Sequence, residues 1–284
     1  MRLNTLLKLV YIAGVTVFAT SCTERIEIDL DESERRIVVD GQITTDTMAH
    51  AIRLTTSTNF FYAEQPPSVT GASVYLDSGT DKILLQENPS GSGIYLTPDN
   101  YFGIPGNSYK LEINLDEKVG ESDFYIAESQ MAETFLQIDS IALEYQDAFE
   151  IWFVKMYAYD PPTKDFYKID IMRNDLMISD TASRAQVTDD RFFNGNNTNG
   201  LTVTILRKDE VAVGDTITLV LSAINEEYYN FFLQLQTESG PANPLFSGPP
   251  ANVISNVKEG GLGFFTALSR KKSILIVKPE MIQP

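Results

Sequence analysis

The sequence has few of the residues on which many functional sites depend. Its 284 residues include one cysteine and one histidine, which excludes an internal disulfide framework and a zinc site built from cysteine clusters. A single histidine also leaves few ways to build a Ser/His/Asp relay. Only 22 basic residues stand against 39 acidic ones, for a formal net charge of -17, so we expect no nucleic-acid partner.

Common catalytic motifs are missing as well. The chain has no G-x-S-x-G nucleophile elbow, no H-E-x-x-H pair and no phosphate-binding loop. We interpret His50, which follows a turn-like segment, as a surface residue. We therefore expect no catalytic residues and no cofactor. Carboxylate pairs are too numerous in so acidic a chain to be informative, and a hydrolase built on two of them stays open as an alternative.

The N-terminal segment, residues 1–21, has the layout of a secretory signal peptide. Two basic residues, Arg2 and Lys8, precede an apolar run from Leu9 to Ala19. This run is too short to span a bilayer permanently. The layout predicts export, with removal of residues 1–21.

Cys22 directly follows this segment and is the only cysteine. Residues 19–22 resemble a bacterial lipobox, although Ala19 stands where leucine is usual. We predict that Cys22 is the acylated mature N-terminus, because two or three acyl chains form a durable membrane anchor. An ordinary signal peptide followed by a chance cysteine is the alternative. Residues 22–35 are rich in Asp and Glu and are predicted to form an acidic tether.

From residue 36 onward, short runs rich in Val, Ile, Tyr and Thr alternate with turn residues. In residues 109–113, apolar side chains occupy every second position, as in a strand with one buried face. This rhythm predicts a mainly β protein, with a β-sandwich over residues 36–131 and a second β-rich domain over residues 132–284. The first domain resembles transthyretin-like and immunoglobulin-like sandwiches, which carry no fixed activity.

One segment of the second domain changes period. After Asn225, the residues Tyr228, Phe232 and Leu235 recur at helical spacing. Asn225 suits the N-cap position, and Gly240 can end the helix. We predict one short amphipathic helix that covers an open end of the second β-unit.

Two further segments contain candidate binding residues. Phe60, Phe61 and Tyr62 form an aromatic cluster in a loop, where they either fill the core or contact a sugar ring or a partner protein. A later turn-rich loop offers oxygen ligands that suit Ca²⁺, but their order does not match an EF-hand, and we favour a loop without metal. These ligands are Asp189, Asp190, Asn194 and Asn196.

The closing part of the chain contains Asn252, Phe264 and Phe265. If residues 264 and 265 are extended, their side chains point to opposite faces, so that one fills the core and the other a groove or a partner surface. We interpret residues 252–265 as a loop folded back over the domain, ahead of a last strand at residues 273–277.

These motifs resemble the domain of unknown function 4249 family along nearly all of the predicted mature chain. The resemblance implies a lipoprotein of Bacteroidota, often encoded beside a TonB-dependent outer-membrane transporter, with no catalytic residues to carry over. An acidic stretch after the lipidated cysteine also resembles the signal that sends such lipoproteins to the cell surface, although a plain solvated linker has the same composition. The matching segments are residues 38–44, 71–72, 106–111, 221–229, 243–250, 252–254 and 260–265.

Together these features predict an outer-membrane lipoprotein that is anchored by its N-terminal lipid. If the acidic stretch acts as the surface signal, the protein lies on the cell surface. We expect it to serve a TonB-dependent transporter as a non-catalytic accessory that binds a ligand or a partner. A purely structural or assembly role is the main alternative, and a carboxylate-based hydrolase is the third. A close group of perturbed carboxylates in a deep cleft would favour the hydrolase.

Overall fold

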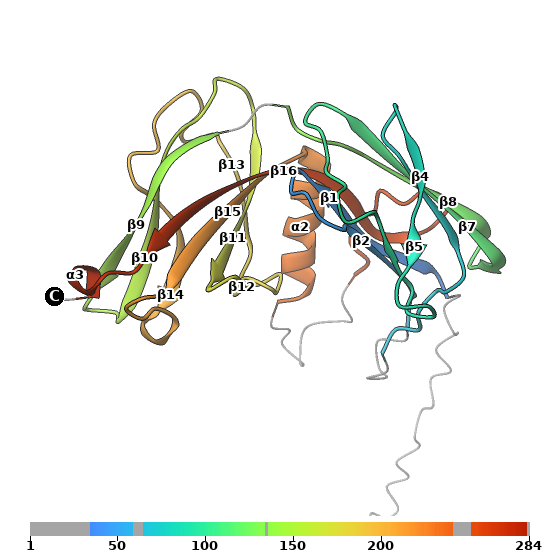
Figure 1. Ribbon diagram of the computed structural model, residues 1–284, viewed down its shortest axis with the longest axis horizontal. Coiled ribbons are helices and arrows are strands. Elements are labelled where there is room, and N and C mark those ends of the chain that lie inside the picture. Colours follow the sequence, from blue (N-terminus) through green and yellow to red (C-terminus); the bar gives the residue numbers. More distant parts are fainter. Residues whose placement is uncertain (1–34, 59–64, 134–135, 241–250, 283–284) are drawn as a thin grey trace, which may run out of the picture. The chain divides into compact units, whose positions relative to one another are not determined.

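The computed structural model describes residues 35–58, 65–133, 136–240 and 251–282 (Figure 1). The signal segment, Cys22 and the aromatic cluster Phe60–Tyr62 lie outside the described residues. Among the residues that are described, no helix combines the length and apolar character needed to cross a membrane.

Strands dominate the described chain, as predicted, and helices are few. The elements are β1 (Ile37–Thr44), β2 (Ala51–Thr56), β3 (Ser73–Asp77), β4 (Lys82–Leu84), β5 (Gln86–Glu87), β6 (Ile94–Leu96), β7 (Ser108–Val119), β8 (Ser122–Gln130), β9 (Gln137–Gln146), β10 (Ile151–Tyr159), β11 (Phe166–Arg173), β12 (Leu176–Met177), β13 (Gln186–Asp189), β14 (Leu201–Arg207), η1 (Lys208–Glu210), β15 (Thr216–Ile224), α2 (Glu226–Glu238), β16 (Leu262–Ile276) and α3 (Pro279–Ile282).

The strands form one long sheet and two smaller ones. The long sheet has the order β12-β11-β15-β16-β1-β2-β6-β5, with β13 also paired to β11. The smaller sheets have the orders β4-β3-β7-β8 and β14-β10-β9. Each smaller sheet shares a hydrophobic core with one half of the long sheet, which makes two β-sandwiches.

Alternating apolar residues build both cores. In β7, Tyr109, Leu111 and Ile113 are buried in the first core, and the residues between them face outward. In β10, Trp152 and Val154 do the same in the second core. The period of two that predicted strands in the sequence is therefore the feature that directs these side chains inward.

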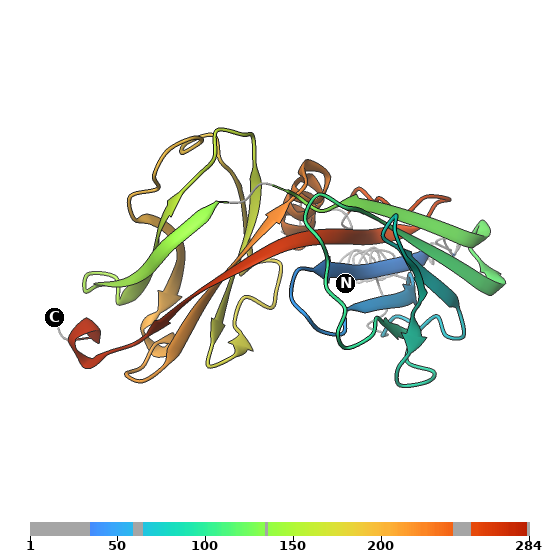
Figure 2. The ribbon, with the colours of Figure 1, turned by 45° about the horizontal axis from the view of Figure 1, so that its top comes forward.

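Strand β16 belongs to both halves of the long sheet. Its first half, residues 262–268, pairs in parallel with β1, and its second half, residues 269–276, pairs antiparallel with β15. Figure 2 shows this strand in red, running beside the blue β1 and the orange β15. The C-terminal part of the chain therefore completes a sandwich that begins at the N-terminal end of the described residues.

The sequence-based interpretation of residues 252–265 as a loop is wrong for residues 262–265, because the strand begins at Leu262. Gly263, within that part, serves the strand pairing. Gly263 has a φ of +85°, and a Cβ there would lie 2.0 Å from the Val39 carbonyl oxygen. Only glycine allows β16 to approach β1 this closely.

The predicted division near residue 131 falls between β8 and β9. The described residues nevertheless all belong to one compact unit. The first core takes Val257, Phe265 and Ala267 from the far end of the chain. Independent folding of residues 36–131 stays a prediction, and that segment by itself lacks these core side chains.

Phe265 is fully buried in the first core, so we expect Phe265→Ala to lower the free energy of unfolding by about 3 to 5 kcal/mol. Ile274, on the same strand, is 64% exposed, and Ile274→Ala should change that free energy by less than about 0.5 kcal/mol. Urea unfolding monitored by circular dichroism compares the two variants with the wild type. Equal effects would contradict the assignment of Phe265 to the core.

Candidate functional site

Helix α2 forms one wall of a groove, and its sequence explains why it is a helix. The Asn225 side-chain oxygen accepts a hydrogen bond from the Tyr228 backbone N–H at 2.8 Å, which caps the N-terminus. Tyr228 and Phe232 recur one turn apart and are buried. The helix predicted from the period is therefore confirmed, and its apolar face packs against the neighbouring strands.

The groove lies between α2, the outward face of β1 and the start of β16, and has a volume of about 740 Å³. Its aromatic lining comes from Tyr228 and Phe231 on α2 and from Phe264 on β16. The ring centroids of Phe231 and Phe264 are 4.8 Å apart, and those of Tyr228 and Phe264 are 5.4 Å apart. These rings form a preorganised apolar surface.

A buried ion pair lies at the groove. Lys168 lines it and forms a salt bridge with Asp170, whose side chain is 1% exposed. Burial lowers the pKa of Lys168, and the charge of Asp170 opposes that change. The Ser179 hydroxyl donates a hydrogen bond to Asp170 Oδ1 at 3.0 Å.

One polar atom of the groove has no partner among the described residues. Thr266 lines the groove from β16, and its buried Oγ1 makes no hydrogen bond. A buried hydroxyl without a partner is costly. This hydroxyl is covered by the groove wall, and the accessible lining is mainly apolar.

Residues 252–265 contribute to this groove, and their two phenylalanines face opposite sides, as neighbouring residues of a strand do. Phe264 and Phe265 point to opposite faces of β16: Phe265 is in the first core, and Phe264 lines the groove. Asn252 is exposed at the groove's edge. Phe265 therefore offers no surface to a partner, which corrects its choice as an interaction residue, because consecutive residues of a strand face opposite sides of the sheet.

His50 is buried, with 3% of its surface exposed, so its interpretation as a surface residue is wrong. Its ring meets the edge of Tyr101 at a centroid distance of 6.0 Å. Burial lowers the pKa of His50. His50 precedes β2 by one residue, and a residue between a turn and a strand can still face the core, which the local sequence does not reveal.

The four oxygen ligands predicted in the turn-rich loop do not gather around one point. Asp189 forms a salt bridge with Arg191, and the Asn194 carbonyl oxygen accepts a hydrogen bond from the Asn196 side chain at 2.7 Å. Asp190 instead joins two acids that the sequence analysis missed, Asp160 and Asp165.

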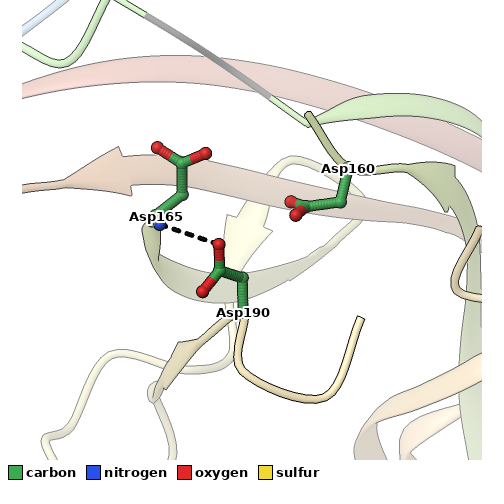
Figure 3. A group of neighbouring side chains, drawn as sticks. All are labelled: Asp160, Asp165 and Asp190. Atoms are coloured by element: carbon green, nitrogen blue, oxygen red, sulfur yellow. Dashed lines mark hydrogen bonds between the residues drawn. The ribbon is translucent and has the colours of Figure 1, made fainter. Parts of the chain in front are cut away.

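Figure 3 shows this acidic cluster of Asp160, Asp165 and Asp190, in which one ligand oxygen from each residue lies within 4.8 Å of the others. Each of these acids lies directly beside the end of a strand. Asp160 follows β10, Asp165 precedes β11, and Asp190 follows β13, which pairs with β11. The pairing of β11 with β13 brings Asp165 and Asp190 together, and the short connection from β10 to β11 places Asp160 beside them.

Asp160 is fully buried. The Tyr167 hydroxyl donates a hydrogen bond to Asp160 Oδ1 at 2.7 Å. Burial raises the pKa of Asp160 to about 6, with the hydrogen bond from Tyr167 opposing this effect and the charge of Asp190 adding to it. The charge of Asp190 therefore disfavours the ionised form of Asp160.

This raised pKa predicts how stability depends on pH in metal-free buffer. Between the ordinary value of 3.8 and about 6, folded Asp160 binds a proton that the unfolded chain has lost, so the free energy of unfolding should fall as pH rises through this window. Asp160→Asn should remove this component, whereas Asp189→Asn should keep it. Urea unfolding between about pH 4 and 7 measures the difference. A wild-type profile parallel to that of Asp160→Asn would contradict the assignment.

Comparison with known proteins gives one family match. Residues 23–274 match the model of the family described as "Domain of unknown function (DUF4249)". No curated protein matches. A solved structure titled "Biofilm associated protein - BSP domain" is similar at 9% identity, over 87% of this chain and 30% of that chain, with a TM-score of 0.20. At so low a TM-score the likeness says nothing about function.

Proposed function

Because the chain belongs to the DUF4249 family, we propose that it is a lipid-anchored outer-membrane protein that serves a TonB-dependent transporter as a non-catalytic accessory. In this proposal the lipid is attached to Cys22, and the groove beside α2 binds a segment of the transporter or of its cargo. The observation that carries the proposal is the groove itself.

The groove has the properties of a recognition site. Its volume of about 740 Å³ falls within the range of about 300 to 1,000 Å³ that is typical of ligand pockets. Half-buried Phe231 offers apolar contact at the groove. The preferred occupant is therefore an apolar group.

The ion pair of Lys168 and Asp170 supports the same conclusion. A buried ion pair contributes little net stability, because well-packed apolar residues are often as good or better in its place. Lys168 also lies over the ring of Phe232 at 5.7 Å from its centroid. A charged pair at a groove is available for recognition, and its position there supports that role.

The acidic cluster gives the hydrolase alternative its best support, since Asp160 has a raised pKa. The burial of Asp160 argues against that alternative. The two carboxylates of a glycosidase flank the bond that they cleave and must reach the substrate, whereas Asp160 is fully buried.

The groove predicts which side chain matters for the partner. We expect Phe231→Ala to weaken the association with the transporter about tenfold or more, because central aromatic anchors dominate such interfaces. Leu233 on the same helix is 38% exposed and does not line the groove, so Leu233→Ala is the matched control. Tagged native protein is extracted in mild detergent, and co-purified transporter is quantified by mass spectrometry.

Loss of the transporter from Phe231→Ala but not from Leu233→Ala supports the proposal. Recovery of the wild type without a transporter, under conditions that keep other transporter complexes intact, contradicts it. Equal recovery with both variants contradicts the role of the groove, and turnover of a glycan or peptide by the purified protein would replace the proposal with the hydrolase alternative.

The lipid anchor has its own test. Cells that express the protein are labelled with a fatty-acid analogue, and the wild type should carry the label and sediment with membranes. Cys22→Ala should lose the label and the membrane association, because the chain has no other cysteine. A wild type without label, or a Cys22→Ala variant that is labelled equally, contradicts the anchor.

A further inference from the structure

The acidic cluster of Asp160, Asp165 and Asp190 lies outside the groove's lining and is not used by the proposed function. Its three residues come from the end of β10, the start of β11 and the end of β13. They are thus held by three strands of the second sandwich.

Backbone pairing holds two of the acids in place. The register of β11 and β13 sets Phe166 opposite Asp189. One step further along, the Asp165 backbone N–H donates to Asp190 Oδ2 at 2.8 Å, and the Asp190 N–H donates to the Asp165 carbonyl oxygen at 3.2 Å. The spacing of these two carboxylates therefore follows from the strand ladder.

Asp160 supplies the independent observation that points to a ligand. Its side chain is fully buried, and its Oδ2 has no hydrogen-bond partner. In Figure 3 its carboxylate points toward the space beside Asp165 and Asp190. Among the described residues, neither Asp160 nor Asp190 forms a salt bridge with a lysine or an arginine. A buried carboxylate oxygen without a donor requires a proton or a cation.

We propose that Asp160, Asp165 and Asp190 bind one Ca²⁺ ion. Ca²⁺ binds oxygen ligands at about 2.3 to 2.6 Å, so two ligands on opposite sides of the ion lie about 4.6 to 5.2 Å apart. Ligand oxygens within 4.8 Å of one another can therefore share it. Mg²⁺ requires about 2.0 to 2.1 Å and near-ideal octahedral geometry, and a site without histidine or cysteine gives softer transition metals no preferred ligand.

The ion would join three segments of the second sandwich. Ca²⁺ takes six to eight oxygens, and three carboxylates supply three to six of them, depending on whether each binds through one oxygen or two. Backbone carbonyls and water complete the shell. Bound Ca²⁺ neutralises the like charges and links β10, β11 and β13, so that binding stabilises the folded state.

Thermal unfolding of the full-length protein, purified in detergent and freed of metal, tests the site. Adding Ca²⁺ at a hundredfold excess over its Kd should raise the Tm of the wild type by about 5 to 10 °C. Asp160→Asn and Asp190→Asn should lose most of this shift. Both substitutions keep the size of the side chain, and each removes one negative charge from the cluster.

Asp189→Asn is the matched control, because Asp189 is adjacent in sequence to Asp190 but forms a salt bridge with Arg191 instead. It should keep the Ca²⁺-dependent shift. Tb³⁺ luminescence is the second measurement: excitation of tyrosine should sensitise the ion, since Tyr167 contacts Asp160. Ca²⁺ should displace the Tb³⁺, and Asp190→Asn should abolish the signal even if Asp160→Asn does not fold.

The proposal is overturned if about 10 mM Ca²⁺, above the millimolar Kd of the weakest calcium modules, neither shifts the wild-type Tm nor displaces Tb³⁺. It is also overturned if Asp160→Asn and Asp190→Asn respond like the wild type, or if Asp189→Asn loses the response equally. None of these outcomes depends on the transporter, so failure here and failure of the proposed function are separate results.

Discussion

The pairing of β16 with both β1 and β15 is the constraint on which the other features of this protein depend. One strand satisfies the backbone of two sheet halves that would otherwise end in open edges. Residues near the two ends of the described chain meet in the ladder of β1 and β16. Just before these strands, Arg36 Nε donates a hydrogen bond to the carbonyl oxygen of Gly260, 224 positions away in sequence. Such distant pairing forms at a large entropic cost, which the core side chains of β16 offset.

The groove is a consequence of the same strand. Because side chains alternate along β16, the residue that precedes buried Phe265 must face the opposite side, where α2 lies. Phe264 thereby meets Tyr228 and Phe231 in one aromatic surface. The first sandwich and the groove are thus built from consecutive residues, and a shift of the strand by one residue would exchange their environments.

At the groove, strand pairing brings apolar side chains into favourable contact, whereas at the acidic cluster it brings like charges together. Strand pairing brings Asp165 and Asp190 together and places buried Asp160 beside them, although like charges repel. Well-packed elements enforce this arrangement, and its electrostatic cost persists until a proton or a cation compensates it. The groove relies on apolar contact, whereas the cluster relies on charge, so one sandwich-based fold offers two chemically different sites.

The sequence by itself determined the fold class, most strands, and the helix that begins after Asn225, because period and capping are local properties. It also predicted that Phe264 and Phe265 face opposite ways if their segment is extended. Only the tertiary structure decided that their segment is a strand, that His50 is buried and that Asp190 lies beside Asp160 and Asp165. These facts depend on which strands pair across long stretches of chain, and local periodicity carries no information about the partner of a strand.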